Sequence, residues 1–272
     1  MSKAATRLGV LGWPVAHSRS PAMQNAALRA VGLADWRYQL LPVPPELFDE
    51  TVRALPAAGF RGANVTIPHK RAALALATDA TSTAGTIGAA NTLTFGDAGE
   101  IFADNTDAPA LIEALPFDAS GRTALVLGAG GSARAAVWAL LDAGAAEVGV
   151  WNRTSERART LCAELGCTAV ASAQPADLLV NCTSIGLQAP QSTFGALPLG
   201  ADQLGQYRCV VDFVYTDRET PLAQAARTRG IPVVDGLALL VGQGALSFER
   251  FTGRPAPVDA MRAAAGGYGG GS

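Results

Sequence analysis

A glycine-rich turn follows the apolar run 125–127 and leads into the helical segment 135–141. It fits the pattern G-x-G-x-x-A and consists of Gly128, Ala129, Gly130, Gly131, Ser132 and Ala133. Gly128 allows a tight turn, Gly130 lets a pyrophosphate approach the backbone, and Ala133 permits close packing of the helix on the strand. The N–H groups at the start of the helix then favour a phosphate. In this setting the turn predicts a dinucleotide-binding site, although glycine-rich turns also occur without a ligand.

The next apolar run, 147–151, ends at residues that distinguish between the two nicotinamide dinucleotides. An acid there would accept hydrogen bonds from the ribose of NAD, but this chain has Asn152, Arg153 and Thr154, with Arg157 one turn into the next helix. Arg153 offers a planar, permanently charged group to a 2′-phosphate, and Thr154 adds a hydroxyl. The segment therefore predicts NADP as the cofactor. The alternative interpretation makes Arg153 a solvated surface cation.

Lys70 lies in the first turn of a helix that is expected to begin at Pro68. A cation in that position opposes the helix dipole by about 0.3–1 kcal/mol, so structure alone would favour an acid there. Reduction of a ketone by hydride needs a proton on the developing alkoxide, and an ammonium group beside a nicotinamide can deliver it or take it back. Lys70 is therefore the candidate proton donor, with an ordinary surface lysine as the alternative.

Further polar residues stand next to expected helix starts. Asp107 ends the segment 104–107 and is either an N-cap or a functional carboxylate. Ser18 and Ser20 precede Pro21, where Ser20 can cap the helix, and two hydroxyls at a helix N-terminus can also bind a carboxylate. Neutral side chains suited to the hydroxyl groups of a ligand are Thr66, Asn91 and Gln243.

Apolar runs alternate with segments of helical periodicity, which is typical of α/β architecture. The first part is expected to form strands at 8–11, 36–43 and 63–66 with helices between them, followed by an antiparallel hairpin of 90–95 and 100–103. After a helix at 110–115, the second part is expected to form strands at 123–127, 147–151, 178–182, 210–213 and 233–234. A last helix over 237–251 can cross back to the first part. At 272 residues, the chain is long enough for two domains.

Composition narrows the class of partner. Only 16% of the residues are charged and the formal net charge is -2, which argues against a nucleic-acid or anionic-membrane partner and favours a small molecule. The sequence has neither an apolar run long enough to span a membrane nor a signal-peptide layout, so a cytoplasmic location is expected. The four cysteines form no C-x-x-C pair and lie far in sequence from both histidines, so we expect reduced thiols near the core and no metal site.

Along 9–253 the chain resembles the shikimate dehydrogenase family. The matching motifs occupy 12–21, 64–70, 88–92, 104–107, 128–133, 152–154, 181–186 and 235–237 with 243–245. The resemblance implies reversible, NADPH-dependent reduction of 3-dehydroshikimate to shikimate, in the pathway to chorismate and the aromatic amino acids. It also implies a substrate-binding and catalytic domain at 1–106, a Rossmann-type NADP domain at 107–236, and C-terminal helices at 237–265 that return to the first domain. The glycine-rich residues 266–272 are expected to form a disordered tail.

The same resemblance assigns roles to residues of both domains. Lys70 and Asp107 would form the catalytic pair, with Lys70 as general acid or base, and Ser18 and Ser20 would bind the substrate carboxylate. The hydroxyl ligands would be Thr66, Asn91, Asp107 and Gln243, with Tyr215 close by. The loop with Thr183 and Ser184 would run beside the cofactor, and Gly236 and Leu239 would lie at the nicotinamide. The family implies a monomer or a homodimer.

Two departures from the family pattern and several alternatives stay open. Ala238 and Leu239 stand where the family often has glycine and methionine, and Tyr215 is followed by Thr216 and Asp217 in place of Asn-Pro. The exchanges predict altered kinetics and leave the loop at Tyr215 undefined. A quinate/shikimate dehydrogenase is an alternative, although Arg153 and Ser20 argue against it, and an aminoshikimate dehydrogenase is another. An alternative of a different class is a non-catalytic NADP-binding regulator.

Overall fold

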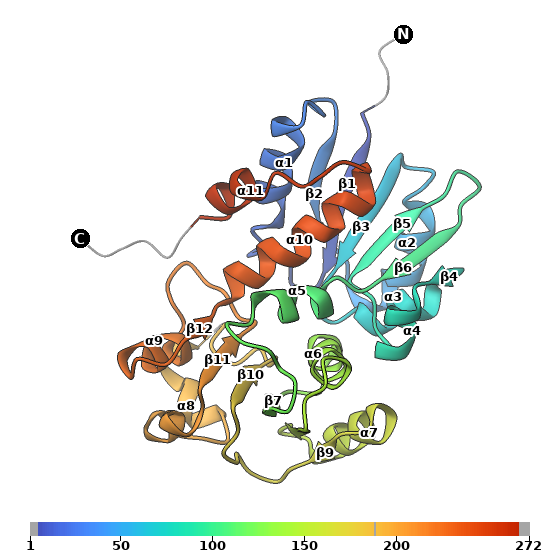
Figure 1. The fold of residues 1–272 in the computed structure, drawn as a ribbon. Coiled ribbons are helices and arrows are strands. Elements are labelled where there is room, and N and C mark those ends of the chain that lie inside the picture. Colours follow the sequence, from blue (N-terminus) through green and yellow to red (C-terminus); the bar gives the residue numbers. More distant parts are fainter. Residues whose placement is uncertain (1–4, 188, 267–272) are drawn as a thin grey trace. The chain divides into compact units, whose positions relative to one another are not determined.

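The computed structural model describes residues 5–187 and 189–266, and these form two compact units (Figure 1). The first unit contains 5–106 and 240–266, and the second contains 107–239. Each unit has its own six-stranded sheet. Most of the tail expected at 266–272 lies outside the described residues. Within the described part of the chain, none of the helices combines the length and the apolar character needed to cross a membrane.

The sheet of the first unit has the strand order β2-β1-β3-β5-β6-β4. Its bounds are β1 (Arg7–Gly12), β2 (Arg37–Pro42), β3 (Phe60–Val65), β4 (Asp79–Ala80), β5 (Thr92–Phe95) and β6 (Ile101–Asp104). The strands β2 and β3 flank β1 in parallel, whereas β5 is antiparallel to both β3 and β6. This confirms the predicted βαβαβ arrangement followed by a hairpin, so the carboxyl ends of β1, β2 and β3 share one edge of the sheet.

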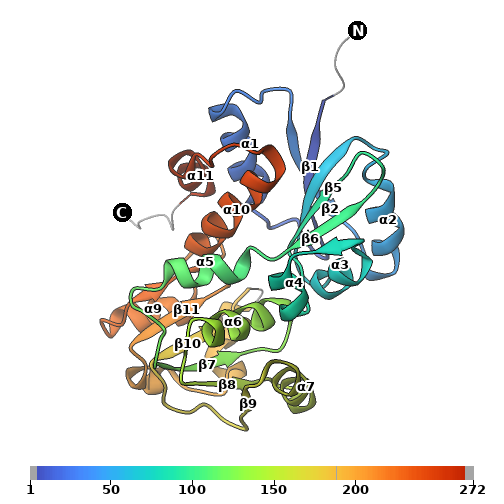
Figure 2. The same cartoon turned by 45° about the vertical axis from the view of Figure 1, so that its right-hand side comes forward.

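Helices cover both faces of this sheet (Figure 2). The core on one face joins Leu11, Val65 and Leu93 of the strands to Phe48 and Val52 of α2 (Phe48–Ala54), with α3 (Lys70–Leu76) beside it. The other face carries α1 (Ser20–Ala30), α11 (Val258–Ala265) and the part of α10 (Gly236–Thr252) that belongs to the first unit. The remaining elements of the unit are the 3-10 helix η1 (Pro45–Leu47) and α4 (Ser82–Ile87).

Gly62 explains how closely α10 approaches β3. A Cβ atom at this position would lie 2.5 Å from the ring of Phe251 in α10 and 2.7 Å from the carbonyl oxygen of Leu93. Real Cβ contacts are longer than 3.0 Å, so a side chain here would push the helix from the sheet. The glycine therefore lets α10 lie against the strand that leads to Lys70.

The start of α1 corrects one expectation. The helix begins at Ser20, and the residue in the N-cap position is Arg19, which makes no side-chain capping bond. Ser20 is therefore the first helical residue and not the cap. The reason is the preceding turn, in which Ser18 N–H donates to the Val15 carbonyl and Ser18 Oγ accepts from Ser20 N–H at 3.3 Å. This turn brings the chain into the helix one residue earlier than the serine–proline pattern suggests.

The second unit has a parallel sheet with the strand order β12-β11-β10-β7-β8-β9. Its strands are β7 (Thr123–Leu127), β8 (Glu147–Trp151), β9 (Thr168–Ala169), β10 (Leu178–Asn181), β11 (Cys209–Asp212) and β12 (Val233–Val234). The order reverses at β7, so strands are added on both sides of it, as in a doubly wound Rossmann-type fold. The alternating side chains Val126 and Leu127 enter different cores on the two faces.

Each core of the second unit is closed by its own helices. One face packs on α5 (Asp107–Ala114), α6 (Gly131–Asp142) and α7 (Ser155–Leu165), and the other on the 3-10 helix η3 (Ala201–Gln206) and α9 (Pro221–Thr228). The segment between β10 and η3 adds the 3-10 helix η2 (Pro190–Ser192) and α8 (Thr193–Ala196). The sheet is thus buried on both faces, which agrees with its apolar strand sequences.

Candidate functional site

Lys70 begins α3 after the turn that follows β3, and the last residue of this turn, His69, is buried. The side chain of Lys70 is 8% exposed, although lysine is rarely buried unless it is paired or functional. The preceding residue, His69, stacks on Phe48 with ring centroids 4.4 Å apart, and its Nε2 lies 2.7 Å from the Val43 carbonyl oxygen. Burial lowers the pKa of His69, and the Val43 contact opposes this shift. A neutral, packed histidine thus fixes the start of α3 at Lys70.

The backbone of Lys70 connects it to the start of the hairpin. The carbonyl oxygen of Lys70 accepts a hydrogen bond of 2.8 Å from the N–H of Ala90, the residue before Asn91. Asn91 is 1% exposed, and its Nδ2 donates to Thr106 Oγ1 at 3.0 Å and to Gln243 Oε1 at 3.3 Å. The first unit therefore brings two of the predicted hydroxyl ligands, Asn91 and Gln243, into direct contact in the neighbourhood of Lys70.

A buried polar network holds these side chains in place. Asn64 Nδ2 donates to Ser247 Oγ at 2.8 Å, and its Oδ1 accepts from the Tyr38 hydroxyl at 2.8 Å. Ser247 Oγ also lies 2.9 Å from Thr92 Oγ1 and 3.1 Å from Thr106 Oγ1, and donates to the Gln243 carbonyl at 2.9 Å. The network joins β2, β3, β5 and α10, so it fixes the side chains at the carboxyl edge of the sheet.

Sequence reasoning did not single out Ser247. Its position four residues after Gln243 in the same helix could have identified it, because residues at that spacing lie on one helical face. Tyr38 was missed for another reason, since a tyrosine inside a strand looks like an ordinary core residue.

The other predicted substrate residues of the first unit lie at the carboxyl ends of β1 and β3. Ser20 is 5% exposed and Ser18 is half-buried, and the two are joined by the Ser18 Oγ contact at the start of α1. Thr66 directly follows β3, and its N–H donates to the Leu11 carbonyl of β1 at 2.8 Å. Asp107 is the first residue of the second unit; it is 7% exposed and begins α5 directly after Thr106.

The glycine-rich turn of the second unit has the expected strand, turn and helix. Gly128 has a φ of 111°, and a Cβ there would lie 3.1 Å from the Cys182 carbonyl oxygen. Gly130 precedes α6, and a Cβ there would meet no atom within 4 Å, so its backbone borders open space. Ala133 is fully buried in the core between α6 and the sheet. Each position thus meets the steric condition that the motif requires. Ala129, Gly131 and Ser132 complete the turn and the first residues of the helix.

After β8, Asn152 is half-buried and the residues that follow it are exposed. Asn152 Nδ2 donates to the Thr154 carbonyl at 2.9 Å, which closes the turn into α7. Thr154 occupies the N-cap position without a side-chain capping bond, and Arg157 N–H donates to its carbonyl oxygen at 3.0 Å. Both arginines, Arg153 and Arg157, are exposed. The turn has no acid, so it presents cations and a hydroxyl at the carboxyl edge of the second sheet.

A second buried network organises the loops after β10 and β11. Asn181 Oδ1 accepts from Thr183 N–H and Oγ1, and Asn181 Nδ2 donates to Asp212 Oδ1 at 2.9 Å. The other oxygen of Asp212 accepts from Thr220 Oγ1 at 2.6 Å. Burial raises the pKa of Asp212 to about 6, although these hydrogen bonds oppose the shift. Asp212 was missed because it ends an apolar strand. Ser184, next to Thr183, is exposed.

Two predicted residues, Gly236 and Leu239, lie at the end of the second unit, next to the loop that carries Tyr215. Gly236 begins α10, and a Cβ there would lie 2.6 Å from the Val214 carbonyl oxygen, so only glycine fits beside this backbone. Leu239 is buried in the same core as α6, and Tyr215 is half-buried in the loop after β11. The close approach holds the start of α10 against the segment that carries Tyr215.

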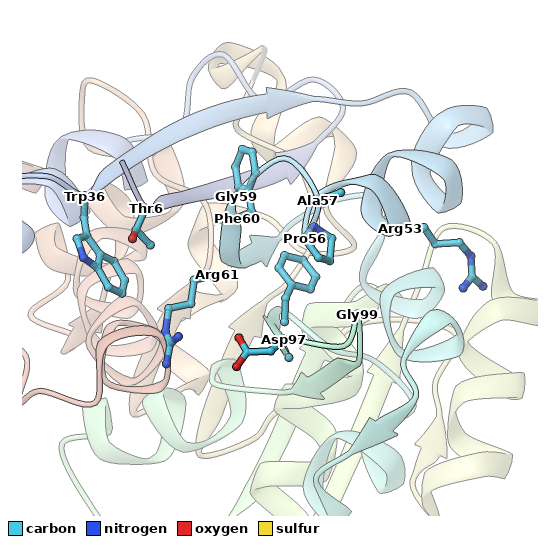
Figure 3. Close-up of a pocket in the computed structure, with 12 residues that line it drawn as sticks. Thr6, Trp36, Arg53, Pro56, Ala57, Gly59, Phe60, Arg61, Asp97 and Gly99 are labelled. Atoms are coloured by element: carbon cyan, nitrogen blue, oxygen red, sulfur yellow. The ribbon is translucent and has the colours of Figure 1, made fainter. Parts of the chain in front are cut away.

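A separate pocket of about 660 Å³ opens at the opposite edge of the first sheet (Figure 3). Its lining residues include Thr6, Trp36 and Gly59, which directly precede β1, β2 and β3, and Asp97 in the turn between β5 and β6. It therefore lies at the amino ends of the strands, away from the Lys70 segment. Among the described residues, no group of three or more His, Cys, Asp or Glu side chains could hold a metal ion.

The fold and the glycine-rich turn place the second unit in the class of Rossmann-type dinucleotide-binding domains. Family models match three stretches of the chain. The shikimate dehydrogenase substrate binding domain matches 10–93, the shikimate / quinate 5-dehydrogenase model matches 111–184, and the shikimate 5'-dehydrogenase C-terminal domain matches 236–265. The chain belongs to the shikimate dehydrogenase family.

Relatives match nearly the whole chain. A shikimate dehydrogenase (NADP(+)) of Paracoccus denitrificans is 45% identical over 270 residues, covering 94% of each protein. The enzyme of the same name from Anaeromyxobacter sp. (strain K) is 46% identical over 273 residues, again covering 94% of each. Among solved structures, shikimate 5-dehydrogenase from Thermus thermophilus in complex with NADP(H) and shikimate is 41% identical, with a TM-score of 0.84. That match covers 96% of this chain and 98% of the Thermus chain.

Proposed function

We propose that this protein catalyses the reversible, NADPH-dependent reduction of 3-dehydroshikimate to shikimate in the cytoplasm, as a monomer or a homodimer. The observation that carries the proposal is the contact of Asn91 with Gln243, one residue away from the Ala90 N–H that donates to the carbonyl oxygen of the buried Lys70. Neutral donors and acceptors beside a buried ammonium suit a small polyhydroxylated ketone. The near full-length similarity to NADP-dependent shikimate dehydrogenases supports the same reaction.

The second unit, which contains the NADP domain predicted at 107–236, is proposed to hold NADP. Open space at Gly130 and the start of α6 suit a pyrophosphate. The exposed Arg153, with Thr154 and Arg157, suits a 2′-phosphate, and the absence of an acid after β8 disfavours NAD. Bound NADPH would supply a hydride to the substrate carbonyl carbon. The residues proposed to contact the cofactor are Gly128, Ala129, Gly130, Gly131, Ser132, Ala133, Asn152, Arg153, Thr154, Arg157, Thr183, Ser184, Gly236 and Leu239.

The first unit is proposed to bind the substrate and move the proton. Ser18 and Ser20, at the start of α1, would hold the carboxylate. Lys70 would donate a proton from Nζ to the carbonyl oxygen of the substrate as it becomes a hydroxyl, and would accept it in the reverse reaction. Asp107 would keep the ammonium in position and contact a hydroxyl. The remaining hydroxyl ligands would be Thr66, Asn91 and Gln243, with Tyr215 nearby.

A matrix of steady-state assays tests the function. The purified protein is given shikimate, quinate or aminoshikimate with NADP or NAD, and formation of the reduced cofactor is followed by absorbance. We expect the highest kcat/KM for shikimate with NADP. A higher kcat/KM for quinate or aminoshikimate would mean that this compound, and not shikimate, is the substrate. No turnover with any of them while NADP still binds would support a non-catalytic regulator.

The role of Lys70 is tested by comparing it with its neighbour. Lys70→Ala should lower kcat by about 10²- to 10⁴-fold, because a general acid contributes rates of that order. Arg71→Ala removes the adjacent exposed cation and should leave kcat unchanged. Equal turnover of Lys70→Ala and the wild type, with both proteins folded, would overturn the proton-transfer assignment.

A further inference from the structure

Two cysteines meet at the end of α7. Cys162 lies in the last turn of the helix and Cys167 follows the helix, and their sulfur atoms are 2.7 Å apart. A disulfide bond has a length of about 2.05 Å, so the two sulfurs would have to approach each other by only about 0.7 Å to form one. Neither thiol has a role in the proposed reaction.

The helix end explains why these side chains meet. Gly166 adopts a left-handed conformation with a φ of 78°, and the N–H groups of Gly166 and Cys167 both donate to the Cys162 carbonyl oxygen. A left-handed glycine that ends a helix in this way brings the side chain after it onto the last helical turn. The contact between residues 162 and 167 is thus set by the backbone of the cap, and β9 follows immediately.

We propose that Cys162 and Cys167 form a redox-active dithiol, which a hydroperoxide or a low-molecular-weight disulfide such as oxidised glutathione converts to an intrachain disulfide. Cys162 is buried in the core between α7 and the sheet, whereas Cys167 is half-buried. Because an external oxidant can reach only the half-buried sulfur, access assigns the first reaction to Cys167 and the second to Cys162, although the contact with Cys162 raises the pKa of Cys167 and so slows this first step.

The chemistry balances in two steps. With oxidised glutathione, the Cys167 thiolate attacks one sulfur, a mixed disulfide forms, and one glutathione thiolate leaves. The Cys162 thiolate then attacks Cys167 Sγ, the protein disulfide forms, and the second glutathione leaves. With a hydroperoxide, Cys167 becomes a sulfenic acid with release of an alcohol or water, and attack by Cys162 expels hydroxide, which leaves as water. In each case the protein loses two electrons and two protons.

Burial makes this a slow site. It raises the pKa of both thiols, and their mutual contact raises that of Cys167 further and lowers that of Cys162. Because the thiolate is the nucleophile, oxidation at neutral pH should be slower than that of an exposed cysteine. The pair therefore responds to sustained oxidation and not to brief exposure.

The experiment uses the reduced full-length protein, incubated with oxidised glutathione at mildly alkaline pH and then alkylated. Before alkylation, we expect a mass about 2 Da below that of the reduced protein, and after alkylation we expect two fewer alkylated thiols. Cleavage after Glu164 separates Cys162 from Cys167, so the two fragments should stay linked until a reductant is added. The same link should form with hydrogen peroxide.

Three variants identify the bond. Cys167→Ser should abolish the link, and Cys162→Ala should stop the reaction at a mixed disulfide of glutathione with Cys167. Cys209→Ala removes another buried thiol and should leave the link intact. Four alkylatable thiols after prolonged oxidation of the wild type, or only bonds between two protein chains, would overturn the proposal.

Discussion

Asn64 Nδ2 donates a hydrogen bond of 2.8 Å to Ser247 Oγ and thereby joins β3 to α10 across a sequence separation of 183 residues. Ser247 is fully buried, and its hydroxyl also contacts Thr92 and Thr106. A single hydroxyl group thus links three strand ends to the helix that carries Gln243. The precise placement of Asn91 and Gln243 depends on residues that are not themselves candidate ligands.

Ser247→Ala should therefore destabilise the protein by about 1–3 kcal/mol, because buried donors lose their partner. Urea unfolding measures the change, with Ser172→Ala as an exposed control. We also expect a higher KM for shikimate, since Gln243 loses the hydrogen bond that Ser247 donates to its carbonyl oxygen. An unfolding midpoint of Ser247→Ala equal to that of the wild type would show that the buried network does not stabilise the folded protein.

Gly130→Ala should weaken NADP binding without unfolding the protein. A Cβ at this position meets no atom of the chain, yet it would occupy the space proposed for the pyrophosphate. We expect the Kd for NADP to rise at least about tenfold, a difference of about 1.4 kcal/mol, with little change in Tm. Isothermal titration calorimetry and thermal unfolding measure the two effects.

Two further glycines serve as comparisons for Gly130. Gly195→Ala also adds a Cβ in open space and should change neither the Kd for NADP nor Tm. Gly236→Ala forces a Cβ against the Val214 backbone and should lower Tm. Normal NADP affinity of Gly130→Ala would show that the turn does not approach the cofactor.

Arg153→Ala should selectively reduce the use of NADP. If the guanidinium contacts the 2′-phosphate, its loss should raise the KM for NADP by about 10- to 100-fold, while the KM for NAD, which lacks this phosphate, should stay constant. Arg159→Ala is the control, because Arg159 lies in α7, the helix that follows Arg153, and is an exposed arginine that pairs with Glu156 at 2.6 Å. Equal effects of Arg153→Ala on both cofactors would indicate a structural role.

Asp212 predicts a pH-dependent stability. Its pKa is raised from 3.8 to about 6 by burial, so the folded protein binds the proton more tightly than the unfolded chain does. Protonation of Asp212 therefore contributes fully to the free energy of unfolding below about pH 4. This contribution, on the order of 3 kcal/mol, is lost as the pH rises through 6. Asp212→Asn lacks this titration.

Urea unfolding of the two proteins between pH 4 and pH 7 measures the effect. Relative to Asp212→Asn, the free energy of unfolding of the wild type should decrease across this range. A constant difference would mean that Asp212 keeps its ordinary pKa.

The sequence predicted the elements whose pattern is local. β7, β8 and β12 were predicted with their observed bounds, because an apolar run that ends at glycine, a polar turn or a helix start defines a buried strand. The glycine-rich turn was identified for the same reason, since each of its residues meets a steric condition within a few positions of sequence.

Other features depend on distant parts of the chain. α4 spans Ser82–Ile87, a segment rich in serine, threonine and glycine with weak helical propensity, and it is stabilised by a Thr81 cap and by burial of Ala84. The contact of Ser247 with Asn64 and the buried Asp212 arise from packing between remote elements. Such pairings cannot be deduced from spacing, because no local periodicity brings those residues together.

The first unit is interrupted in sequence by the second, since it needs both 5–106 and 240–266. During translation, β1 to β6 leave the ribosome well before α10 and α11 have been synthesised. The second unit is continuous and can complete its sheet as soon as β12 emerges, whereas the polar edge of the first sheet must wait for Ser247. A nascent chain can thus finish the dinucleotide fold first, while the part of the first sheet that α10 and α11 cover stays exposed until these helices emerge, and in this interval the chain is most prone to aggregate.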